Sequence, residues 1–322
     1  MVDVHEVLDD FGRHAPGEAA RVREVLPHPE ASWARLIDGW DGVRDAIAVL
    51  AEWADREGRT RPAAAAAPPP LADPAVGIFA IGANFATHAA QAQFAVEGGD
   101  GVDARIAALL KNRRDGVPPW GFTILPRTVS GPGEPIGRPR GAELLDYEGE
   151  VGAVLRRGPS GDLSVWGVAA FHDVSVRDPH FRVGPRIDEG PITWVLQKNF
   201  RGGSALGPVV VVDEALDVHR LSITTRVNGE VRQRGDTGEM VYGFDDVAAY
   251  LDRCVPMRSG DVIASGTPAG TAFESGRDGP YLQDGDLVEI EVEGVGVLAN
   301  RVASPDSEHT GQRPAARTGA QQ

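Results

Sequence analysis

The most informative stretch of the chain is Leu-Leu-Asp-Tyr-Glu-Gly-Glu-Val-Gly-Ala-Val-Leu, residues 144–155, in which acidic residues run directly into an apolar segment. Residues 151–155 are typical of a buried strand, and residues i and i+2 of a strand point to the same face. Glu148 and Glu150 are therefore expected to project side by side. A third carboxylate follows at Asp173, within His-Asp-Val-Ser-Val-Arg-Asp. The segment thus predicts a strand that carries clustered acidic side chains.

Clustered carboxylates raise one another's pKa values unless a cation or a proton lies between them. A set of oxygen ligands without clustered Cys or His residues favours a hard ion such as Mg²⁺, Mn²⁺ or Ca²⁺. The alternative is an acidic strand face in contact with solvent. The spacing alone leaves both interpretations open, a divalent-metal site and a solvated acidic surface.

Length and charge exclude several classes of protein. At 322 residues the chain is long enough to bury a sizeable core. Its formal net charge is −15, from 32 basic and 47 acidic residues, which argues against a nucleic-acid or anionic-membrane partner. No apolar run approaches the length of a membrane-spanning helix, and no basic stretch followed by an apolar core opens the chain. We therefore expect a soluble protein with neither a nucleic-acid nor a membrane partner.

The single cysteine, Cys254, excludes an internal disulfide framework and fits a reducing compartment. It lies among the apolar residues Leu251, Val255 and Met257, so we expect a buried structural thiol rather than a nucleophile. Cysteine usage therefore predicts a cytoplasmic protein.

The first sixty residues are predicted to be helical, within an N-terminal region over residues 1–74. Apolar residues recur there at steps of three and four, which is typical of one amphipathic helix. They are Trp33, Leu36, Ile37, Trp40, Val43, Ile47, Leu50 and Trp53. Gly39 and Gly42 are the points at which this helix could be interrupted. The run Arg-Pro-Ala-Ala-Ala-Ala-Ala-Pro-Pro-Pro at 61–70 predicts a stiff, extended connector.

Beyond the connector the sequence becomes rich in short apolar runs separated by Gly, Pro and Asp. Strands are predicted at 76–81, 151–155, 209–212, 221–227 and 287–292, and helices from about 82–91 and near 244–253. The dipeptide Asn228-Gly229 is typical of a tight hairpin turn. Residues 304–322 are polar and lack periodicity, which predicts a disordered tail. The predicted fold class is α+β, dominated by strands, with one domain over residues 75–303.

Four segments of the chain share their order and spacing with one known enzyme family. They are Ile-Gly-Ala-Asn-Phe-Ala-Thr-His at 81–88; Asp-Tyr-Glu-Gly-Glu at 146–150; His-Asp-Val-Ser-Val-Arg-Asp at 172–178, with Gln-Lys-Asn-Phe at 197–200 and Leu-Gly-Pro at 206–208; and Ser-Gly-Thr-Pro-Ala-Gly at 265–270, with the run 285–300. Each alone is a weak signal, whereas all four in order are specific. Together they resemble the fumarylacetoacetate hydrolase family over about residues 75–303, and this favours the metal site over the solvated face.

The resemblance implies a fold and an assembly. It implies a catalytic domain with a mixed-sheet β-roll core, with a smaller N-terminal α/β region packed on it. It also implies a homodimer that binds a small-molecule substrate.

The resemblance also implies a metal centre. Glu148, Glu150 and Asp173 match the family's carboxylate ligands for a Mg²⁺-like ion. Mg²⁺ or Mn²⁺ is expected, and carboxylate ligands suit Ca²⁺ as well. Waters and the substrate's adjacent carbonyl or enolate oxygens would complete the coordination shell. Such an ion acts as a Lewis acid that stabilises the enolate formed when a bond next to a carbonyl breaks.

Further residues match positions near that centre. Lys198 matches a family lysine that faces the metal pocket, where its cation would stabilise developing negative charge; the alternative is an exposed loop lysine. Arg177 is expected either to contact a substrate carboxylate or to form a structural ion pair. Gly266 and Thr267 lie in a Gly-Thr-Pro turn whose amides and hydroxyl suit a substrate carboxylate, and stabilisation of the turn is the alternative.

His88 is the catalytic base that the resemblance implies, and a capping or packing role is the alternative. In the family this histidine lies on a mobile segment, and a glutamate three residues later orients it to activate water. Here that position is Gln91, on the same helix face. Glutamine can hold a histidine tautomer by a hydrogen bond, but it cannot stabilise an imidazolium as a carboxylate does. A more distant acid, Glu97 or Glu274, is a candidate substitute.

A second departure from the family lies at Leu125, which occupies the place of an expected lysine before proline in Gly-Phe-Thr-Ile-Leu-Pro, 121–126. Loss of that charge favours a less anionic or differently shaped ligand at the substrate site. A Pro-, Gly- and Arg-rich insert between Asp178 and Trp194 is expected to lie near the site and to reshape its pocket.

These residues predict a divalent-metal-dependent enzyme that acts on a small oxo-acid or β-dicarbonyl compound through a metal-bound enolate. The expected reactions are C–C hydrolysis and keto–enol isomerisation or decarboxylation. The departures at Gln91 and Leu125 favour an alternative, a non-hydrolytic tailoring enzyme that dehydrates, cyclises or isomerises a larger, less charged metabolite. A catalytically inactive metal-binding homologue is the remaining hypothesis.

Overall fold

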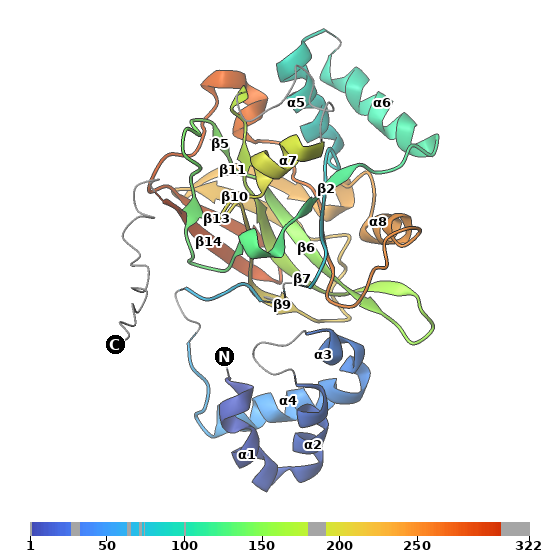
Figure 1. Cartoon of the computed structure of the whole chain (residues 1–322), viewed down its shortest axis with the longest axis vertical. Helices are drawn as coiled ribbons and strands as arrows, with labels where there is room; N and C mark the ends of the chain where they lie inside the picture. Colours follow the sequence, from blue (N-terminus) through green and yellow to red (C-terminus); the bar gives the residue numbers. More distant parts are fainter. Residues whose placement is uncertain are drawn as a thin grey trace, which may run out of the picture.

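The computed structural model describes residues 2–26, 33–62, 66–70, 73, 75–99, 101–179 and 191–303. Figure 1 shows a strand-rich body, a group of helices below it, and the helices α5 (Ala86–Glu97) and α6 (Val102–Arg114) at its upper end.

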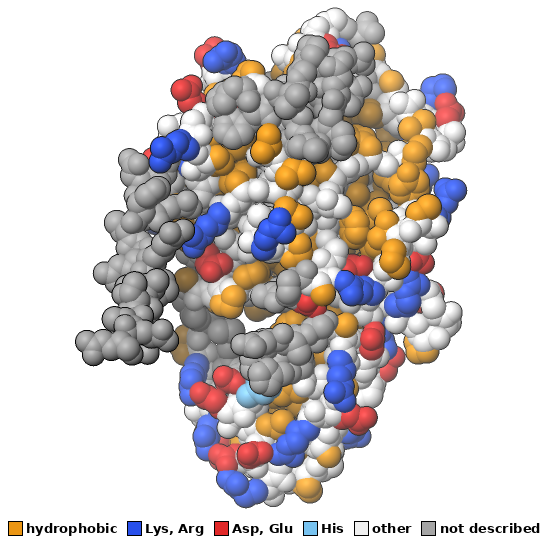
Figure 2. Space-filling view, viewed as in Figure 1, with side chains coloured by type: hydrophobic (Ala, Val, Ile, Leu, Met, Phe, Trp, Pro, Cys, Tyr) orange, Lys and Arg blue, Asp and Glu red, His pale blue; other side chains and the backbone are white. Residues whose placement is uncertain are grey.

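The N-terminal region is helical in the residues that the structure describes. Its helices are α1 (Val4–His14), α2 (Pro16–Val25), α3 (Ala34–Asp38) and α4 (Trp40–Arg56). α1 begins after Asp3, whose side chain accepts hydrogen bonds from the backbone N–H groups of His5 and Glu6. The four helices bury one hydrophobic cluster of their own, which includes Phe11 and Leu50. Acidic and basic side chains are intermixed on the outer surface of this region (Figure 2).

The amphipathic helix predicted through residues 33–53 is interrupted at Gly39, one of the two points expected, because the chain turns there; Gly42 lies inside α4. α3 ends at Asp38 and α4 begins at Trp40. A Cβ atom at position 39 would lie 2.6 Å from the Cγ1 atom of Val25, at the end of α2. The close approach of α2 therefore requires glycine at the turn.

A seven-stranded mixed sheet forms the centre of the body. Its strand order is β2-β1-β12-β6-β7-β9-β3. The strands are β1 (Ile78–Ile81), β2 (Gly121–Ile124), β3 (Val129–Ser130), β6 (Gly149–Arg157), β7 (Leu163–Asp173), β9 (Ser204–Val211) and β12 (Val262–Ala264). The pairs β1–β12 and β3–β9 are parallel, and the other neighbours are antiparallel. The long β6–β7 pair lies at the middle of this sheet.

A five-stranded sheet packs beside the first, with the order β11-β10-β13-β14-β4. Its strands are β4 (Ile136–Gly137), β10 (Ser222–Val227), β11 (Glu230–Asp236), β13 (Leu287–Val292) and β14 (Gly296–Ala303). The short strands β5 (Leu145–Asp146) and β8 (Ser175–Val176) pair with each other. The remaining helices of the described residues are α7 (Pro191–Lys198), α8 (Phe244–Leu251) and the 3-10 helices η1 (Pro126–Thr128), η3 (Thr237–Glu239) and η4 (Ala272–Asp278).

The main hydrophobic cluster contains side chains from both sheets, among them Val151, Leu155, Ile223 and Ile290. The predicted strand-dominated α+β fold is confirmed by this arrangement. The predicted hairpin at Asn228-Gly229 is also confirmed, since both residues have positive φ angles, 52° and 81°, and they join β10 to β11.

The N-terminal helices contact the body through a few side chains. The rings of Trp40 and Trp166, the latter on β7, meet edge to face with centroids 5.2 Å apart. Arg156, at the end of β6, donates two hydrogen bonds of 2.8 Å to Asp41. The division into regions 1–74, 75–303 and 304–322 stays a prediction, and the predicted disordered tail lies outside the described residues.

The expectation of a buried thiol at Cys254 is wrong, because this side chain is exposed. α8 ends at Leu251, and the Cys254 backbone N–H donates to the Leu251 carbonyl in the turn that follows. The turn leaves the Cys254 side chain exposed, and Met257 is buried instead. Within the described residues, no helix combines the length and apolar character needed to cross a bilayer.

Substitution of Gly39 tests the packing of α2 against the start of α4. We expect Gly39→Ala to lower the free energy of unfolding by about 1–3 kcal/mol, because the added methyl group overlaps Val25. Gly42→Ala is the control, since a Cβ atom there meets nothing within 4 Å. Alanine at that position should stabilise α4 by about 0.5–1 kcal/mol. Urea unfolding measures both, and equal effects would contradict the assignment.

Candidate active site

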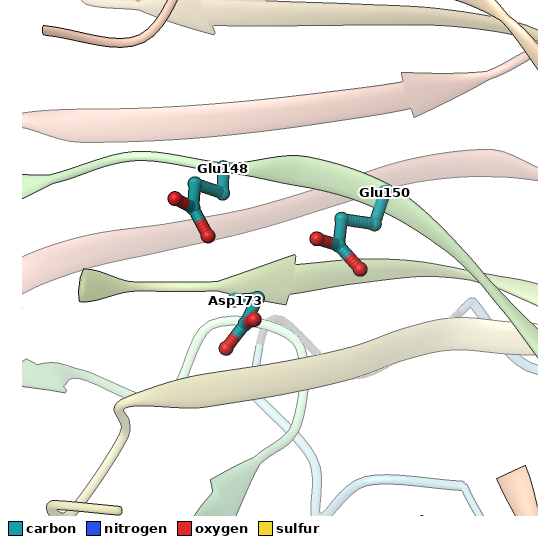
Figure 3. A group of neighbouring side chains, drawn as sticks. All are labelled: Glu148, Glu150 and Asp173. Carbon is teal, nitrogen blue, oxygen red and sulfur yellow. The ribbon is translucent and has the colours of Figure 1, made fainter. Parts of the chain in front are cut away.

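The β6–β7 pair brings three carboxylates together. Glu150 lies on β6 and Glu148 immediately before it, while Asp173 ends β7. The Asp173 backbone N–H donates to the Glu148 carbonyl at 3.0 Å, which fixes the two residues opposite each other. Ligand atoms of the three side chains all lie within 4.8 Å of one another. Figure 3 shows Glu148 and Glu150 pointing from one strand towards Asp173 on the next.

This acidic cluster is buried rather than exposed. Glu148 is 5 % exposed, and Glu150 and Asp173 are each 2 % exposed. The alternative interpretation of a solvated acidic face is therefore wrong. Buried carboxylates need cations or hydrogen-bond donors to remain charged.

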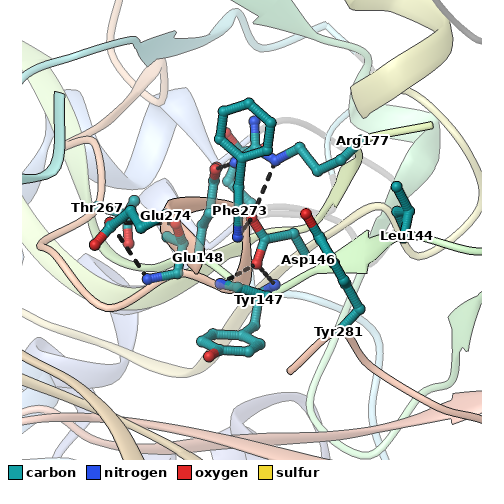
Figure 4. Close-up of polar contacts among 12 residues, drawn as sticks. Leu144, Asp146, Tyr147, Glu148, Arg177, Thr267, Phe273, Glu274 and Tyr281 are labelled. Atoms are coloured by element: carbon teal, nitrogen blue, oxygen red, sulfur yellow. Dashed lines mark hydrogen bonds and ion pairs between the residues drawn. The ribbon is translucent and has the colours of Figure 1, made fainter. Parts of the chain in front are cut away.

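Two buried cations contact the cluster. The Lys198 ammonium, at the end of α7, lies 2.6 Å from Glu148 Oε2 and 2.8 Å from Asp173 Oδ2. Arg177 binds Asp146 at 3.0 Å through Nε and binds Glu148 through Nη2. Figure 4 shows Arg177 beside Asp146 and Glu148, with the ring of Phe273 close by. Lys198 is buried, so the alternative interpretation of an exposed loop lysine is wrong.

Within the part of the chain that the structure describes, the charges of the cluster do not balance. With Asp146, Glu148, Glu150 and Asp173 ionised, four negative charges face the two positive charges of Arg177 and Lys198. A divalent cation among the carboxylates would supply the missing two charges. The buried Asp173 Oδ1 atom has no hydrogen-bond partner among the described residues. An all-oxygen donor set with an unsatisfied oxygen fits a hard divalent ion such as Mg²⁺, Mn²⁺ or Ca²⁺.

Burial and mutual repulsion shift the pKa values of these carboxyls apart. Burial raises the pKa of Glu150 well above its ordinary range, and the charges of Asp173 and Glu148 raise it further. Burial also raises the pKa of Asp173, to about 6, although Lys198 opposes the shift. For Glu148 burial acts in the same direction, but Lys198 and Arg177 outweigh it and lower the pKa to about 2. Glu148 is thus the carboxylate that the two cations keep ionised.

His88 lies in the first turn of α5, and its carboxylate partner is Glu274. The distance from His88 Nδ1 to Glu274 Oε1 is 2.6 Å. Glu274 belongs to η4 and also accepts hydrogen bonds from the Gly270 N–H at 2.9 Å and the Thr271 hydroxyl at 3.2 Å. The other candidate acid, Glu97, pairs instead with Arg105. The carboxylate partner of His88, which was expected at position 91, therefore comes from a distant part of the chain.

The Gly-Thr-Pro turn is tied directly to the acidic strand. The Gly266 N–H donates to Glu150 Oε2 at 3.1 Å, and the Thr267 hydroxyl donates to the Gly149 carbonyl at 2.9 Å. Gln233 on β11 completes the link: it accepts from the Gly149 N–H at 3.0 Å and donates to Thr267 Oγ1 at 2.8 Å. These bonds support the turn-stabilising role of Thr267, and its contact with substrate stays a prediction.

Leu125 lies half-buried after β2, and its N–H donates to the side chain of Asn199 at 2.6 Å. The nearby Phe122 ring centroid is 5.1 Å from the Lys198 ammonium. Both side chains are apolar, and a role of Leu125 in binding substrate stays a prediction. The expectation that the insert reshapes the pocket falls on residues 180–190, which lie outside the described residues.

Sequence reasoning missed two residues of this region. Gln233 carries no motif, since a single amide on a strand is common. Phe273 stacks on Arg177, with the guanidinium carbon 4.8 Å from the ring centroid. It lies next to Glu274, and only the tertiary fold brings this pair to the acidic strand. No local pattern in the sequence would have identified either residue.

Comparison with known proteins agrees with the four sequence segments. A family model described as fumarylacetoacetate (FAA) hydrolase, C-terminal, matches residues 77–303. The mitochondrial oxaloacetate tautomerase of Homo sapiens is 34% identical over 189 residues, 56% of this chain and 58% of that protein. The 4-hydroxyphenylacetate degradation bifunctional isomerase/decarboxylase of Escherichia coli is 29% identical over 249 residues, 74% of this chain and 49% of that protein.

A solved structure shares the fold. The fumarylacetoacetate hydrolase of Exiguobacterium antarcticum is 28% identical, with a TM-score of 0.54 over 72% of this chain and 76% of that one. The chain spans only about three fifths of the length of the first curated relatives that it matches, 58% to 62%.

The charge imbalance predicts an effect of Glu150→Gln on metal binding. We expect Mg²⁺ or Mn²⁺ to raise the unfolding temperature of the wild type, since a ligand of the folded state adds about 2.7 kcal/mol at a hundredfold excess over Kd. Glu150→Gln should abolish this shift. In EDTA it should raise the unfolding temperature instead, because it replaces a carboxyl whose ionised form is disfavoured by burial and by its acidic neighbours. Glu230→Gln, at an exposed site, is the control. A retained metal shift in Glu150→Gln would contradict the site.

Asp173 predicts a pH dependence of stability in EDTA. Its pKa is raised from the ordinary 3.8 to about 6, so between these values the folded state holds a proton that the unfolded state has lost. Stability falls with rising pH wherever the folded state binds more protons. This contribution is therefore present below pH 3.8 and is lost as the pH rises through about 6. Urea unfolding across this window should show a steeper decline for wild type than for Asp173→Asn, and equal slopes would contradict the shift.

Proposed function

The chain belongs to the fumarylacetoacetate hydrolase family, and we propose that it is a divalent-metal-dependent enzyme acting on a small oxo-acid or β-dicarbonyl compound. The observation that carries the proposal is the buried group of Glu148, Glu150 and Asp173, whose ligand atoms lie within 4.8 Å of one another beside Lys198. Burying three carboxylates at this separation is unfavourable without compensating charge. Mg²⁺ or Mn²⁺ is the proposed cofactor.

A divalent ion held by these carboxylates polarises a carbonyl and stabilises the negative charge of an enolate. The chain's own residues support the same charge. Lys198 is buried and hydrogen-bonded to Glu148 and Asp173, so its ammonium is fixed beside the place where that charge develops. Arg177 is engaged by Asp146 and Glu148, which supports a role in holding the acidic strand more than direct contact with substrate.

His88 is the proposed base. A proton on Nδ1, donated to the Glu274 carboxylate at 2.6 Å, leaves the lone pair of Nε2 to accept a proton. The carboxylate also stabilises the imidazolium that results. Since Glu274 provides what Gln91 cannot, the site retains a charged partner for the histidine. This arrangement supports proton transfer rather than the hypothesis of a catalytically inactive protein.

Among the reactions open to such a site, we propose keto–enol isomerisation first. His88 would remove the proton from the carbon between two carbonyl groups and, as the imidazolium, return it to the enolate oxygen; the reverse transfer converts the enol to the keto form. This step needs one base and one centre of positive charge, both of which the residues here can supply. C–C hydrolysis and decarboxylation pass through the same enolate and remain further candidates of the proposal.

A second candidate substrate class follows from the apolar edge at Leu125 and Phe122. Half-buried Leu125 lies where the family has a cation, and the Phe122 ring faces Lys198. These side chains favour a larger, less charged metabolite in a non-hydrolytic tailoring reaction. The homodimer, the cytoplasmic location and the absence of nucleic-acid or membrane partners stay predictions, and the net charge of −15 supports the last of these.

An enol-absorbance assay tests the proposal. Purified protein with Mg²⁺ or Mn²⁺ is added to oxaloacetate and to an acylpyruvate, with EDTA as the metal-free comparison. We expect metal-dependent loss or gain of the enol absorbance. His88→Ala should lower kcat by about 10²–10⁴-fold, the usual contribution of a general base, and should leave the metal-dependent shift in unfolding temperature unchanged. Gln93→Ala, an exposed position on the same helix, is the control. No metal-dependent change with any dicarbonyl compound would contradict the function.

A further inference from the structure

His88 lies on α5, and neither α5 nor the following helix α6 buries many side chains against the body. In α5 the buried side chains are Ala89 and Ala90, and none of the side chains of α6 is buried. The two helices, residues 86–114, are here called the α5–α6 pair. They lie together at the upper end of the molecule in Figure 1. Because so little side-chain burial holds this pair, its placement depends on how its two ends are attached.

The N-terminal end is attached through Asn84, which is 2 % exposed. Its side-chain amide donates to the carbonyl of Tyr242 at 3.0 Å and to that of Ser265 at 2.7 Å. Its side-chain oxygen accepts from the Tyr242 N–H at 2.9 Å, and its backbone carbonyl accepts from the Val241 N–H at 2.7 Å. The three hydrogen bonds that the structure describes for this side-chain amide all go to the body, so the start of α5 is firmly fixed.

The C-terminal end of the pair is also attached to Val241 and Tyr242. Arg113, in the last turn of α6, donates to the Val241 carbonyl at 3.3 Å and lies over the Tyr242 ring at 5.0 Å. It also pairs with Asp246 at 2.8 Å. The Tyr242 hydroxyl donates to the Val117 carbonyl at 2.5 Å, just beyond the helix. Val241 and Tyr242 thus hold both ends of the α5–α6 pair.

The C-terminal attachment is polar and borders open space. A cavity of about 420 Å³ lies beside it, lined by Arg113, Tyr242, Asp246, Tyr250, Arg253 and the loop 116–119. In Figure 2, hydrophobic side chains gather on the surface over the region of α6 and α8. Because the loop 116–119 lines this cavity and no side chain of α6 is buried, a packed core does not hold the end of α6. The end of α6 is therefore constrained by the stacking and the ion pair of Arg113 and by the hydroxyl bond of Tyr242.

We propose that Tyr242 and Arg113 are positioning residues for His88, acting through the α5–α6 pair; this inference rests on the proposed function. Glu274 is fixed to the body by the hydrogen bonds of η4, whereas His88 is carried by α5. The contact between them therefore depends on where the pair sits. A displacement of about 1 Å at a catalytic group can lower a rate by about 100-fold. Attachment of both ends to one dipeptide keeps His88 aligned with Glu274.

Conservative variants test the inference. Tyr242→Phe removes the hydroxyl and keeps the ring, and Arg113→Met removes the cation and keeps an unbranched side chain. We expect each to lower kcat by about 3–30-fold, with smaller changes in KM, a range bounded by the cost of misplacing the base. Tyr250→Phe and Arg114→Met are the matched controls. Tyr250 lines the same cavity, and Arg114 is the exposed neighbour of Arg113. The controls should leave kcat unchanged, and so should the metal-dependent thermal shift in all four variants.

A double-mutant cycle separates positioning from general damage. In a His88→Ala background, Tyr242→Phe should have no further effect on kcat, because the group that it positions is gone. An undiminished effect in that background would overturn the inference. So would an unchanged kcat in both Tyr242→Phe and Arg113→Met with His88 intact.

Hydrogen exchange provides a readout that does not need turnover. Amides of residues 86–114 should exchange faster in Tyr242→Phe and Arg113→Met than in wild type, while those of β6 and β7 should be unchanged. If the wild type turns over no substrate, the proposed function fails, and faster exchange would still support attachment of the pair by these residues. Unchanged exchange over 86–114 would overturn the inference whatever the activity.

Discussion

Four buried carboxylates that face two cations among the described residues, the buried Lys198 and the largely buried Arg177, are the constraint on which the site depends. Removing ions from water costs several kcal/mol each unless geometry and hydrogen bonds compensate, and the fold responds to this cost at each carboxylate. Lys198 and Arg177 converge on Glu148, Gly266 donates its N–H to Glu150, and Asp146 accepts from Arg177 and from the N–H of Ala272. Burial and mutual repulsion raise the pKa values of Glu150 and Asp173, and a divalent ion in place of their protons would relieve this cost.

The sheet holds the carboxylates close together because it fixes side by side the two strands, β6 and β7, from which they project. Gly149, between the two glutamates, has no room for a side chain, since a Cβ atom there would lie 2.0 Å from Thr225 Oγ1 on β10. The second sheet is therefore pressed against the strand that carries the acids. Gln233, from that same sheet, holds the strand to the turn at Thr267. The two sheets together fix the carboxylates, whereas the candidate base is carried by helices outside them.

Local patterns in the sequence predicted the parts of the molecule that local forces determine. The i, i+2 spacing of Glu148 and Glu150 placed them on one face of a strand, and Asn228-Gly229 placed a hairpin, since each depends on neighbouring residues alone. Gly39 is a candidate break from the sequence alone, but the contact with α2 that requires glycine there depends on what packs nearby, as does the exposure of Cys254 in the turn after α8. Composition alone contains neither contact. The roles of the predicted site residues are likewise set by partners far along the chain, as Gln233 sets that of Thr267.

The pairing of His88 with Glu274 spans 186 positions of sequence. A pattern search that looks for an acid three places after the histidine finds Gln91 and scores this protein as deficient. The histidine nevertheless has its carboxylate, delivered by a turn that no linear motif would associate with it. Classification of such chains as active or inactive should therefore rest on a three-dimensional template of the imidazole and its nearest acid. Annotation by one-dimensional signatures would miss a histidine–carboxylate pair that the fold assembles from distant segments.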